Sequence, residues 1–224
     1  MSAARRSAPL IVLALMAGAT ARAVPVTPGA PPTTLPGTTA LADPALAGVV
    51  LADVVSPWAS ADDPMYGFPG AEGQLQSRVV RETASGTLDF YWRLSVNPAS
   101  YPGFVPTALV IDGLSPALLQ TGAVFDADYR SDGSGDAAPS GASATDDALT
   151  WLFDPSTFGP GSSSFLLLLR SAATSYDASA LARVGVSSPA TFAPSAVPEP
   201  AGAALLLAGL GALGAFAARA RRPR

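Results

Sequence analysis

The chain has 224 residues, carries 17 acidic residues against 13 arginines, and contains no cysteine, histidine or lysine. The absence of Cys and His excludes disulfide bonds, thiolate nucleophiles, Ser-His-Asp and Cys-His catalysis, and the usual ligands of zinc. Only carboxylate, hydroxyl and guanidinium groups remain for chemistry, and this favours a protein that is not an enzyme.

Charge is distributed unevenly along the chain. Seven of the arginines lie within the first 22 or the last six residues, while residues 24–218 hold six arginines and all 17 acidic residues. The body therefore has a net charge of about −11, which argues against nucleic acid as a partner because phosphate contacts need cations. An acidic surface favours solubility or the binding of divalent cations.

Residues 1–23 are typical of a secretory signal peptide. Arg5 and Arg6 precede the apolar stretch 10–17, which is too short to span a bilayer, and Ala21-Arg22-Ala23 offers a cleavage site. The alternative interpretation is an N-terminal membrane anchor. Residues 24–47 follow with six prolines among Thr, Ala and Gly, a composition that predicts an extended and partly disordered linker.

Residues 48–194 are expected to form the folded ectodomain. Its clearest element is 87–96, where Leu88, Phe90, Trp92, Leu94 and Val96 alternate with polar residues or Tyr91, as in a half-buried strand. The apolar run 165–169 after a Gly/Ser-rich turn favours a central strand, although hydrophobicity alone also allows a buried helical turn. Further strands are predicted at 49–55, 74–82, 108–112, 123–129, 149–153, 165–170, 181–186 and 191–193. Short strands without an amphipathic helix predict an all-β fold, a single antiparallel β-sandwich.

A Gly-rich stretch holds the weak candidates for a calcium site. Clustered carboxylates can bind this ion, and the candidates are Asp126, Asp128, Asp132 and Asp136. The stretch does not follow the EF-hand pattern, because with Asp128 at position 1 the third and twelfth positions are Arg130 and Pro139. A solvated acidic loop is the default interpretation, and no other cofactor is expected.

Two further hypotheses concern carbohydrate. Trp58, Tyr66 and Tyr101 lie in predicted Pro/Gly-rich loops and can stack on sugar rings, whereas Trp92 is expected in the core. A pair of carboxylates can also hydrolyse glycosidic bonds, and outside the tail only Glu72 and Glu82 are candidate Glu residues. Ordinary loop packing is the alternative for the aromatic residues.

Residues 195–224 contain three elements in a fixed order. Pro198, Glu199 and Pro200 form a rigid break that no helix interior tolerates. The uncharged run 201–218 is long enough for a transmembrane helix of about 27 Å. An Arg-rich end follows and predicts a cytoplasmic location for this terminus. Its arginines are Arg219, Arg221, Arg222 and Arg224.

This triplet resembles the PEP-CTERM sorting signal, and the resemblance covers only the last thirty residues or so. The resemblance implies recognition by an exosortase, a membrane-embedded transpeptidase, and removal of the helix. Pro198, Glu199, Pro200, Arg219, Arg221 and Arg222 would then be sorting residues and not catalytic ones. A plain single-span anchor is the alternative. The body segments 86–91 and 158–163 look more loosely like other PEP-CTERM cargo.

The sequence therefore predicts an exported, non-enzymatic surface or extracellular-matrix protein. It is expected to be anchored in the inner membrane before processing, and then to reach the envelope or the extracellular space. Association with exopolysaccharide is part of this expectation, because it is common in bacteria with this sorting system. A calcium- or carbohydrate-binding module at the envelope is the alternative.

Overall fold

The computed structural model describes residues 23–62, 64–65, 67–114 and 124–195, and these form an all-β body, as predicted. The strands in chain order are β1 (Val24–Val26), β2 (Gly48–Ala59), β3 (Glu72–Glu82), β4 (Leu88–Val96), β5 (Ala108–Asp112), β6 (Phe125–Arg130), β7 (Gly141–Ala144), β8 (Ala148–Leu152), β9 (Leu166–Arg170), β10 (Ser175–Arg183) and β11 (Ala190–Ser195). Two 3-10 helices complete the elements, η1 (Pro44–Leu46) and η2 (Pro102–Phe104).

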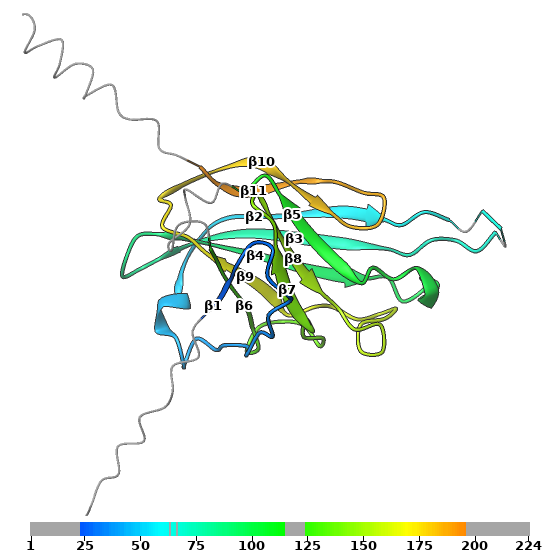
Figure 1. The fold of residues 1–224 in the computed structure, drawn as a ribbon, viewed down its shortest axis with the longest axis horizontal. Helices are drawn as coiled ribbons and strands as arrows, with labels where there is room; N and C mark the ends of the chain where they lie inside the picture. Colours follow the sequence, from blue (N-terminus) through cyan, green and yellow to red (C-terminus); the bar gives the residue numbers. More distant parts are fainter. Residues whose placement is uncertain (1–22, 63, 66, 115–123, 196–224) are drawn as a thin grey trace, which may run out of the picture.

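The strands form two antiparallel sheets that share one hydrophobic core (Figure 1). The order in sheet A is β1-β6-β9-β4-β3-β2, and the order in sheet B is β11-β10-β5-β8-β7. Trp92 of sheet A packs against Trp151 of sheet B, with ring centroids 5.3 Å apart, and both side chains are buried. The core therefore lies between the sheets, as the predicted two-layer arrangement requires.

Strand β4 confirms the alternation seen in the sequence. Its residues Leu88, Phe90, Trp92, Leu94 and Val96 all belong to the shared core. β4 pairs with β3 through a turn that contains Gly86 at φ 75°, a left-handed conformation that favours glycine. The strand and its hairpin partner are thus where the period-two pattern places them, but β4 is not half-buried, because Asp89 and Tyr91 on its other face are buried as well.

The apolar run 165–169 lies almost entirely in β9, which is the central strand predicted from its sequence. β9 pairs with β6 on one side and β4 on the other. Leu167 and Leu169 face the shared core, while Leu166 and Leu168 join a smaller cluster on the outer face of sheet A. Because both faces are covered, this strand is apolar throughout and does not alternate.

The predicted linker, residues 24–47, is instead part of the fold, and we call it the N-terminal segment. Its first residues form β1, which pairs with β6, and Thr33 forms an isolated bridge with Ala142. Leu35 packs in the shared core, and Leu46 covers the smaller cluster. The prolines suggested a solvated spacer, but extended backbone can still bury the apolar residues between them. In Figure 1 this segment, drawn in blue, lies against the sheets.

Some strands were missed or shortened in the sequence-based prediction. β7 consists of small residues, Gly-Ala-Ser-Ala, and it carries neither branched side chains nor an apolar alternation. β10 begins six residues before the predicted strand because its first half is exposed and polar. Packing against neighbouring strands, and not the local sequence pattern, favours the extended conformation of these two segments.

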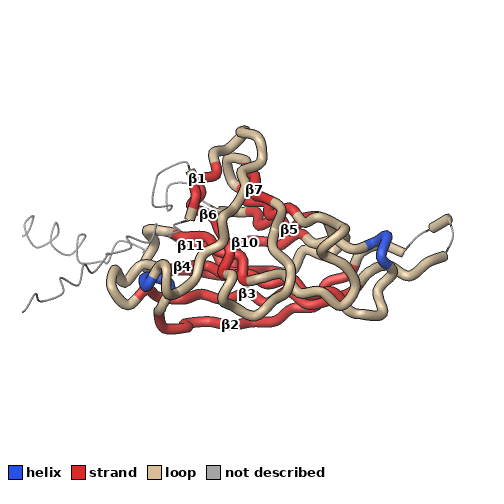
Figure 2. The backbone as a smooth tube through the Cα atoms, turned by 90° about the horizontal axis from the view of Figure 1, so that it is seen from below, coloured by secondary structure: helices blue, strands red, loops and turns tan. Residues whose placement is uncertain are grey.

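Helical structure is limited to η1 and η2 in the described residues (Figure 2). Neither helix in this part of the chain is long and apolar enough to cross a membrane. The expected signal peptide and the expected transmembrane helix lie outside the described residues.

Candidate functional site

The first pair of predicted calcium ligands lies on β6. Asp126 and Asp128 point to the same face of that strand, because side chains two residues apart share a face. Asp128 is fully buried, and its Oδ1 accepts a hydrogen bond of 2.9 Å from the backbone N–H of Gly37. Burial raises the pKa of Asp128 to about 6, although the N–H groups of Tyr129 and Gly37 oppose this shift.

The other two predicted ligands are engaged elsewhere. Asp132 forms an ion pair with Arg130 at 3.0 Å and accepts a 2.7 Å hydrogen bond from the N–H of Ala40. Asp136 accepts a 2.9 Å bond from the N–H of Ser163. The four carboxylates therefore do not converge, and no group of three acidic residues in the described ranges is arranged to hold a metal ion.

A buried charge cluster that sequence reasoning missed lies on the outer face of sheet A. We call it the Arg170 cluster, and it consists of Asp43, Glu82, Asp89 and Arg170. The Arg170 guanidinium lies 2.5 Å from the Asp43 carboxylate and 3.9 Å from that of Glu82. Arg170 is also directly opposite Asp89 in the register of β4 and β9. The contact with Asp43 attaches the N-terminal segment to the sheet.

Asp89 is the most strongly perturbed carboxyl group of this cluster. Burial and the nearby Glu82 carboxylate raise the pKa of Asp89 to about 8, while Arg170 opposes them. The Asp89 Oδ1 has no hydrogen-bond partner among the described residues. Asp89 is only 1 % exposed, so it acts on stability and offers a substrate little access.

The two Glu residues considered for glycoside hydrolysis do not form a pair. Glu72 begins β3 and Glu82 ends it. An 11-residue strand separates its ends by roughly 33 Å at about 3.3 Å per residue, whereas glycosidase carboxylates lie roughly 5 to 10 Å apart. The structure therefore contradicts this pair as a catalytic one.

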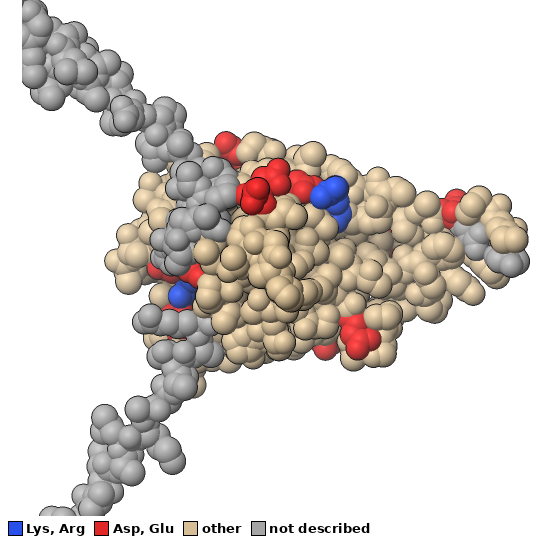
Figure 3. Space-filling view, in the orientation of Figure 1, with Lys and Arg blue, Asp and Glu red and all other residues tan. Residues whose placement is uncertain are grey.

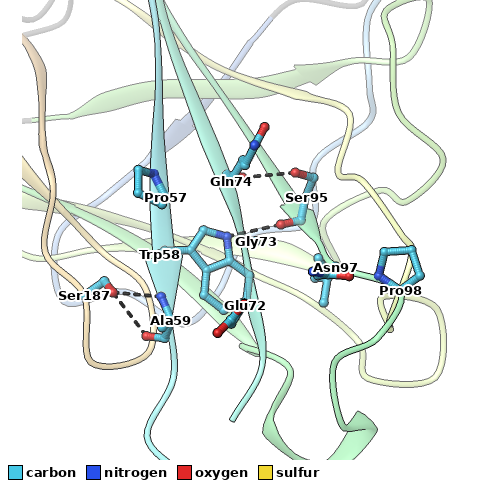
Figure 4. Close-up of a pocket in the computed structure, with 11 residues that line it drawn as sticks. Pro57, Trp58, Ala59, Glu72, Gly73, Gln74, Ser95, Asn97, Pro98 and Ser187 are labelled. Carbon is cyan, nitrogen blue, oxygen red and sulfur yellow. Dashed lines mark hydrogen bonds between the residues drawn. The ribbon is translucent and has the colours of Figure 1, made fainter. Parts of the chain in front are cut away.

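An open groove of about 680 Å³ lies where β2, β3 and β4 meet the β10–β11 hairpin (Figure 4). We call it the Glu72 groove. Ser187 of the hairpin accepts a 2.8 Å hydrogen bond from the N–H of Ala59 and closes one side. Its lining is mixed and comprises Pro57, Trp58, Ala59, Glu72, Gly73, Gln74, Ser95, Val96, Asn97, Pro98 and Ser187.

Trp58 forms part of the wall of this groove and is not the free loop residue that was predicted. It lies in β2 and is only 3 % exposed. Its indole N–H donates a 3.1 Å hydrogen bond to the carbonyl of Ser95, and a Cβ on Gly73 would come within 2.7 Å of the ring. Pro57 suggested a loop, but an edge strand accommodates a proline.

Polar and aromatic groups accessible to a ligand surround the groove. The Glu72 carboxylate lines it and has no hydrogen bond or ion pair to any described residue. Two smaller hollows share Glu72 with it, and both are also lined by Pro69 and Gly70. Beside them Phe68 stacks on Tyr101 with centroids 4.5 Å apart, and each ring is 40 % exposed. Tyr66 lies outside the described residues.

The face of the molecule drawn in Figure 3 carries few charges. Carboxylates lie at several places on it and basic groups at only two. An anionic ligand would therefore meet few compensating charges on this face.

A comparison with known protein families identifies the tail. The model of the PEP-CTERM protein-sorting motif matches residues 196–222. No curated protein and no solved structure matches the chain. The matched range includes Pro198, Glu199, Pro200, Arg219, Arg221 and Arg222, which all lie outside the described residues. The motif marks an exported protein that is sorted by an exosortase and anchored in the membrane before processing, and the chain therefore carries a PEP-CTERM sorting signal at residues 196–222.

Proposed function

We propose that the body is a non-enzymatic component of the cell surface or extracellular matrix, exported by its N-terminal signal and sorted by its tail. The observation that carries this proposal is the sorting motif over residues 196–222. The charged side chains of the body support this proposal, because Asp132, Asp136 and the Arg170 cluster form ion pairs or hydrogen bonds within the fold. Such contacts stabilise a fold and leave few groups for catalysis.

The proposed route has three steps. Residues 1–23 direct export, and the apolar run 201–218 then holds the protein in the inner membrane with the body outside. An exosortase recognises Pro198-Glu199-Pro200 and removes the helix with its Arg-rich end. The released body then associates with the envelope or with exopolysaccharide.

Two epitope tags test this route in a host that carries an exosortase. One tag is inserted after Ser195, which ends β11, and the other after Arg224. We expect the first tag to appear in the envelope or the medium on a shorter chain that lacks the second. Both tags together in the inner membrane would show a permanent anchor and refute the proposed release.

A matched pair of variants tests recognition. Glu199→Ala removes the carboxylate of Pro198-Glu199-Pro200. We expect both tags of this variant to stay in the membrane fraction. Glu72→Ala, in the body, is expected to leave processing unchanged. Equal processing of the two variants would show that the cleavage does not depend on Glu199.

The Glu72 groove favours carbohydrate binding as a second candidate function. Its open shape, the unpaired Glu72 carboxylate and the amide groups of Gln74 and Asn97 suit the hydroxyl groups of a sugar. The exposed Tyr101 ring beside it offers an apolar stacking surface. These features favour an uncharged polysaccharide, since the body is acidic.

Affinity electrophoresis in gels that contain neutral or acidic polysaccharides tests this second candidate. We expect a neutral polysaccharide to retard the protein, and Glu72→Gln or Tyr101→Ala to reduce the retardation at least threefold. Tyr176→Ala, at the end of β10 opposite the Ser187 turn, is the control and is expected to migrate like the wild type. Equal migration in all gels would contradict binding at this groove without affecting the sorting proposal.

A further inference from the structure

Residues 36–47 of the N-terminal segment lie over the outer face of sheet A, and we call them the strap. Both ends of the strap are fixed, because Leu35 packs in the shared core and Gly48 begins β2. Between these ends the N–H of Thr38 donates a hydrogen bond to the carbonyl of Tyr129 in β6. No residue of the strap, which the structure describes in full, belongs to a strand of either sheet. Lifting the strap would therefore leave all pairs of strands intact.

Carboxyl groups supply further attachments between the strap and the sheet. Asp128 and Asp132 accept hydrogen bonds from two backbone N–H groups of the strap, at 2.9 and 2.7 Å. Asp43, which belongs to the strap, forms the ion pair of 2.5 Å with Arg170 of β9. The attachment of the strap therefore depends on the ionisation of side chains.

The charges beneath the strap do not balance. Asp43, Glu82 and Asp89 lie beside the Arg170 guanidinium. The side chains of Arg170, Asp43 and Glu82 are 13, 12 and 7 % exposed, and Asp89 is buried. Asp126, opposite Arg170 in the register of β6 and β9, adds a fourth carboxyl group. Because one guanidinium does not compensate several buried carboxylates, the closed strap requires a proton on at least one of them.

Asp89 is the carboxyl group that holds this proton. Its Oδ1 has no hydrogen-bond partner in the described part of the chain, so a negative charge there would be uncompensated. Burial and the Glu82 carboxylate raise the pKa of Asp89 to about 8, against the effect of Arg170. Val80 lies opposite Asp89 in the register of β3 and β4, and it packs in the same cluster as Leu46 of the strap. The strap therefore shields Asp89 from water.

The other titratable groups around Asp89 and the strap keep their charge near pH 8. Burial raises the pKa of Tyr91 and of Tyr129, so both side chains stay neutral. Burial acts to raise the pKa of Asp132, but hydrogen bonds from Arg130 and from the strap lower it overall. Burial raises the pKa of Asp128 only to about 6. Of these groups and Asp89, it is Asp89 that changes its charge at about pH 8.

We propose that the strap is a proton-controlled cover, which is closed over sheet A while Asp89 is protonated and opens when Asp89 is ionised. Opening admits water to Asp89 and Glu82, and it moves the Asp43 carboxylate away from the negative charge beneath it. It also exposes the apolar side chains of Leu166 and Leu168. This inference concerns the body alone and does not depend on how the tail is processed.

The pH dependence of opening has a defined sign. In the open form Asp89 meets water, and its pKa returns toward the ordinary value of 3.8, whereas it is about 8 in the closed form. The closed form therefore binds the proton more tightly. Its advantage is fully present below about pH 4 and is lost as pH rises toward 8.

Two adjacent valines of β3 allow a matched test in the full chain, solubilised in detergent, because the chain contains no cysteine. Val80 lies in the smaller cluster beneath the strap, and Val79 lies in the shared core. Each is replaced singly, as Val80→Cys or Val79→Cys, and labelling by N-ethylmaleimide is followed against pH. Ala178→Cys, at an exposed position on β10, gives the labelling rate of a free thiol at each pH.

We expect the rate of Val80→Cys, relative to that of Ala178→Cys, to rise at least tenfold between about pH 5 and about pH 8.5. Val79→Cys should stay at least tenfold slower than Val80→Cys at every pH, since the shared core remains closed. Addition of Asp89→Asn should abolish the rise. Equal rates for the two buried cysteines would show global unfolding in place of strap opening, and a rise that survives Asp89→Asn would contradict control by this residue.

Hydrogen exchange in the wild-type chain tests the proposal without a substitution. The N–H of Gly37 is bonded to Asp128 in the closed strap. We expect its protection factor, which is corrected for the intrinsic effect of pH on exchange, to fall at least tenfold over the same pH range. A constant protection factor would refute the proposal even if the cysteine variants failed to fold.

Discussion

At the scale of single residues, the buried carboxyl groups on the outer face of sheet A have the largest effect on the energetics of the body. The Asp89 Oδ1 has no hydrogen-bond partner among the described residues, and Asp128 accepts a hydrogen bond from the N–H of Gly37 in the N-terminal segment. Burial raises the pKa of both groups, to about 8 and about 6. Both residues therefore couple folding to proton uptake.

The first prediction concerns Asp89 and pH. Because its folded pKa is raised above the unfolded value of about 3.8, its contribution to stability is present below about pH 4 and is lost as pH rises toward 8. Asp89→Asn keeps the neutral form, and we expect it to stabilise the protein at pH 7 by on the order of 2 kcal/mol. Urea unfolding at pH 5 and pH 8 measures the effect, which should be smaller at pH 5.

Asp53 is the control, because its pKa is shifted in the opposite direction to that of Asp89. Partial burial raises its pKa, but hydrogen bonds from Arg78 and Gln76 outweigh this and lower the pKa overall. Its contribution is therefore present above its unfolded pKa and is lost as pH falls. Asp53→Asn should destabilise the protein by less than about 1 kcal/mol at pH 7, as expected for an exposed pair. Destabilisation by both variants at pH 7 would contradict the raised pKa of Asp89.

The second prediction concerns the glycine beneath Trp58. A Cβ at position 73 would lie 1.9 Å from the carbonyl oxygen of Ser95 and 2.7 Å from the indole, so Gly73→Ala forces backbone to move. We expect a loss of about 2 kcal/mol or more. Gly159→Ala meets no atom within 4 Å and is expected to change stability by less than about 0.5 kcal/mol. Thermal unfolding of both variants checks this contrast.

At the scale of elements, the N-terminal segment holds the outer face of sheet A in place. Leu46 lies over Val80, Tyr91, Leu166 and Leu168, and Asp43 forms an ion pair with Arg170 beside them. Without this cover, Tyr91 of β4 and Leu166 and Leu168 of β9 would meet water. The segment is therefore a structural element, although it contains little regular secondary structure.

A leucine pair in this segment provides the third prediction. Leu46 is 2 % exposed and Leu41 is 93 % exposed, although only four residues separate them. We expect Leu46→Ala to cost about 2 to 4 kcal/mol, because it leaves a cavity over the smaller cluster. Leu41→Ala should be neutral. Equal and small effects in chemical denaturation would show that residues 24–47 behave as a linker after all.

At the scale of the whole molecule, contacts between distant parts of the sequence define the fold. Val24 pairs with Ala127, the indole of Trp92 donates to Thr191, and Ala59 donates to Ser187. Loops of about one hundred residues must close before these contacts form. Folding is therefore expected to be slow and to depend on the complete chain.

The fourth prediction is a refolding rate in the range of milliseconds to seconds. All three tryptophans of the chain are buried, at Trp58, Trp92 and Trp151, so stopped-flow fluorescence follows the formation of the core. Deletion of β1 by starting the chain at Thr27 should accelerate unfolding, since it removes the pairing with β6. Unchanged unfolding kinetics would show that β1 contributes little to the body.

Local patterns were sufficient for several conclusions drawn from the sequence alone. The sorting motif is contiguous, so its Pro-Glu-Pro, apolar and Arg-rich parts are recognisable without a fold. The alternation in β4 predicts a strand with one buried face, because side chains point to opposite sides in turn. The absence of Cys and His excludes whole classes of chemistry whatever the structure is.

Only the tertiary structure decided which of the remaining residues act together. The Arg170 cluster joins residues from Asp43 to Arg170, and the Glu72 groove joins β2 to a hairpin more than a hundred residues later. The packing of the N-terminal segment and the exposure of β2 likewise depend on strand order. Strand order follows from which apolar faces exclude water together, a property of the whole chain that no local stretch contains.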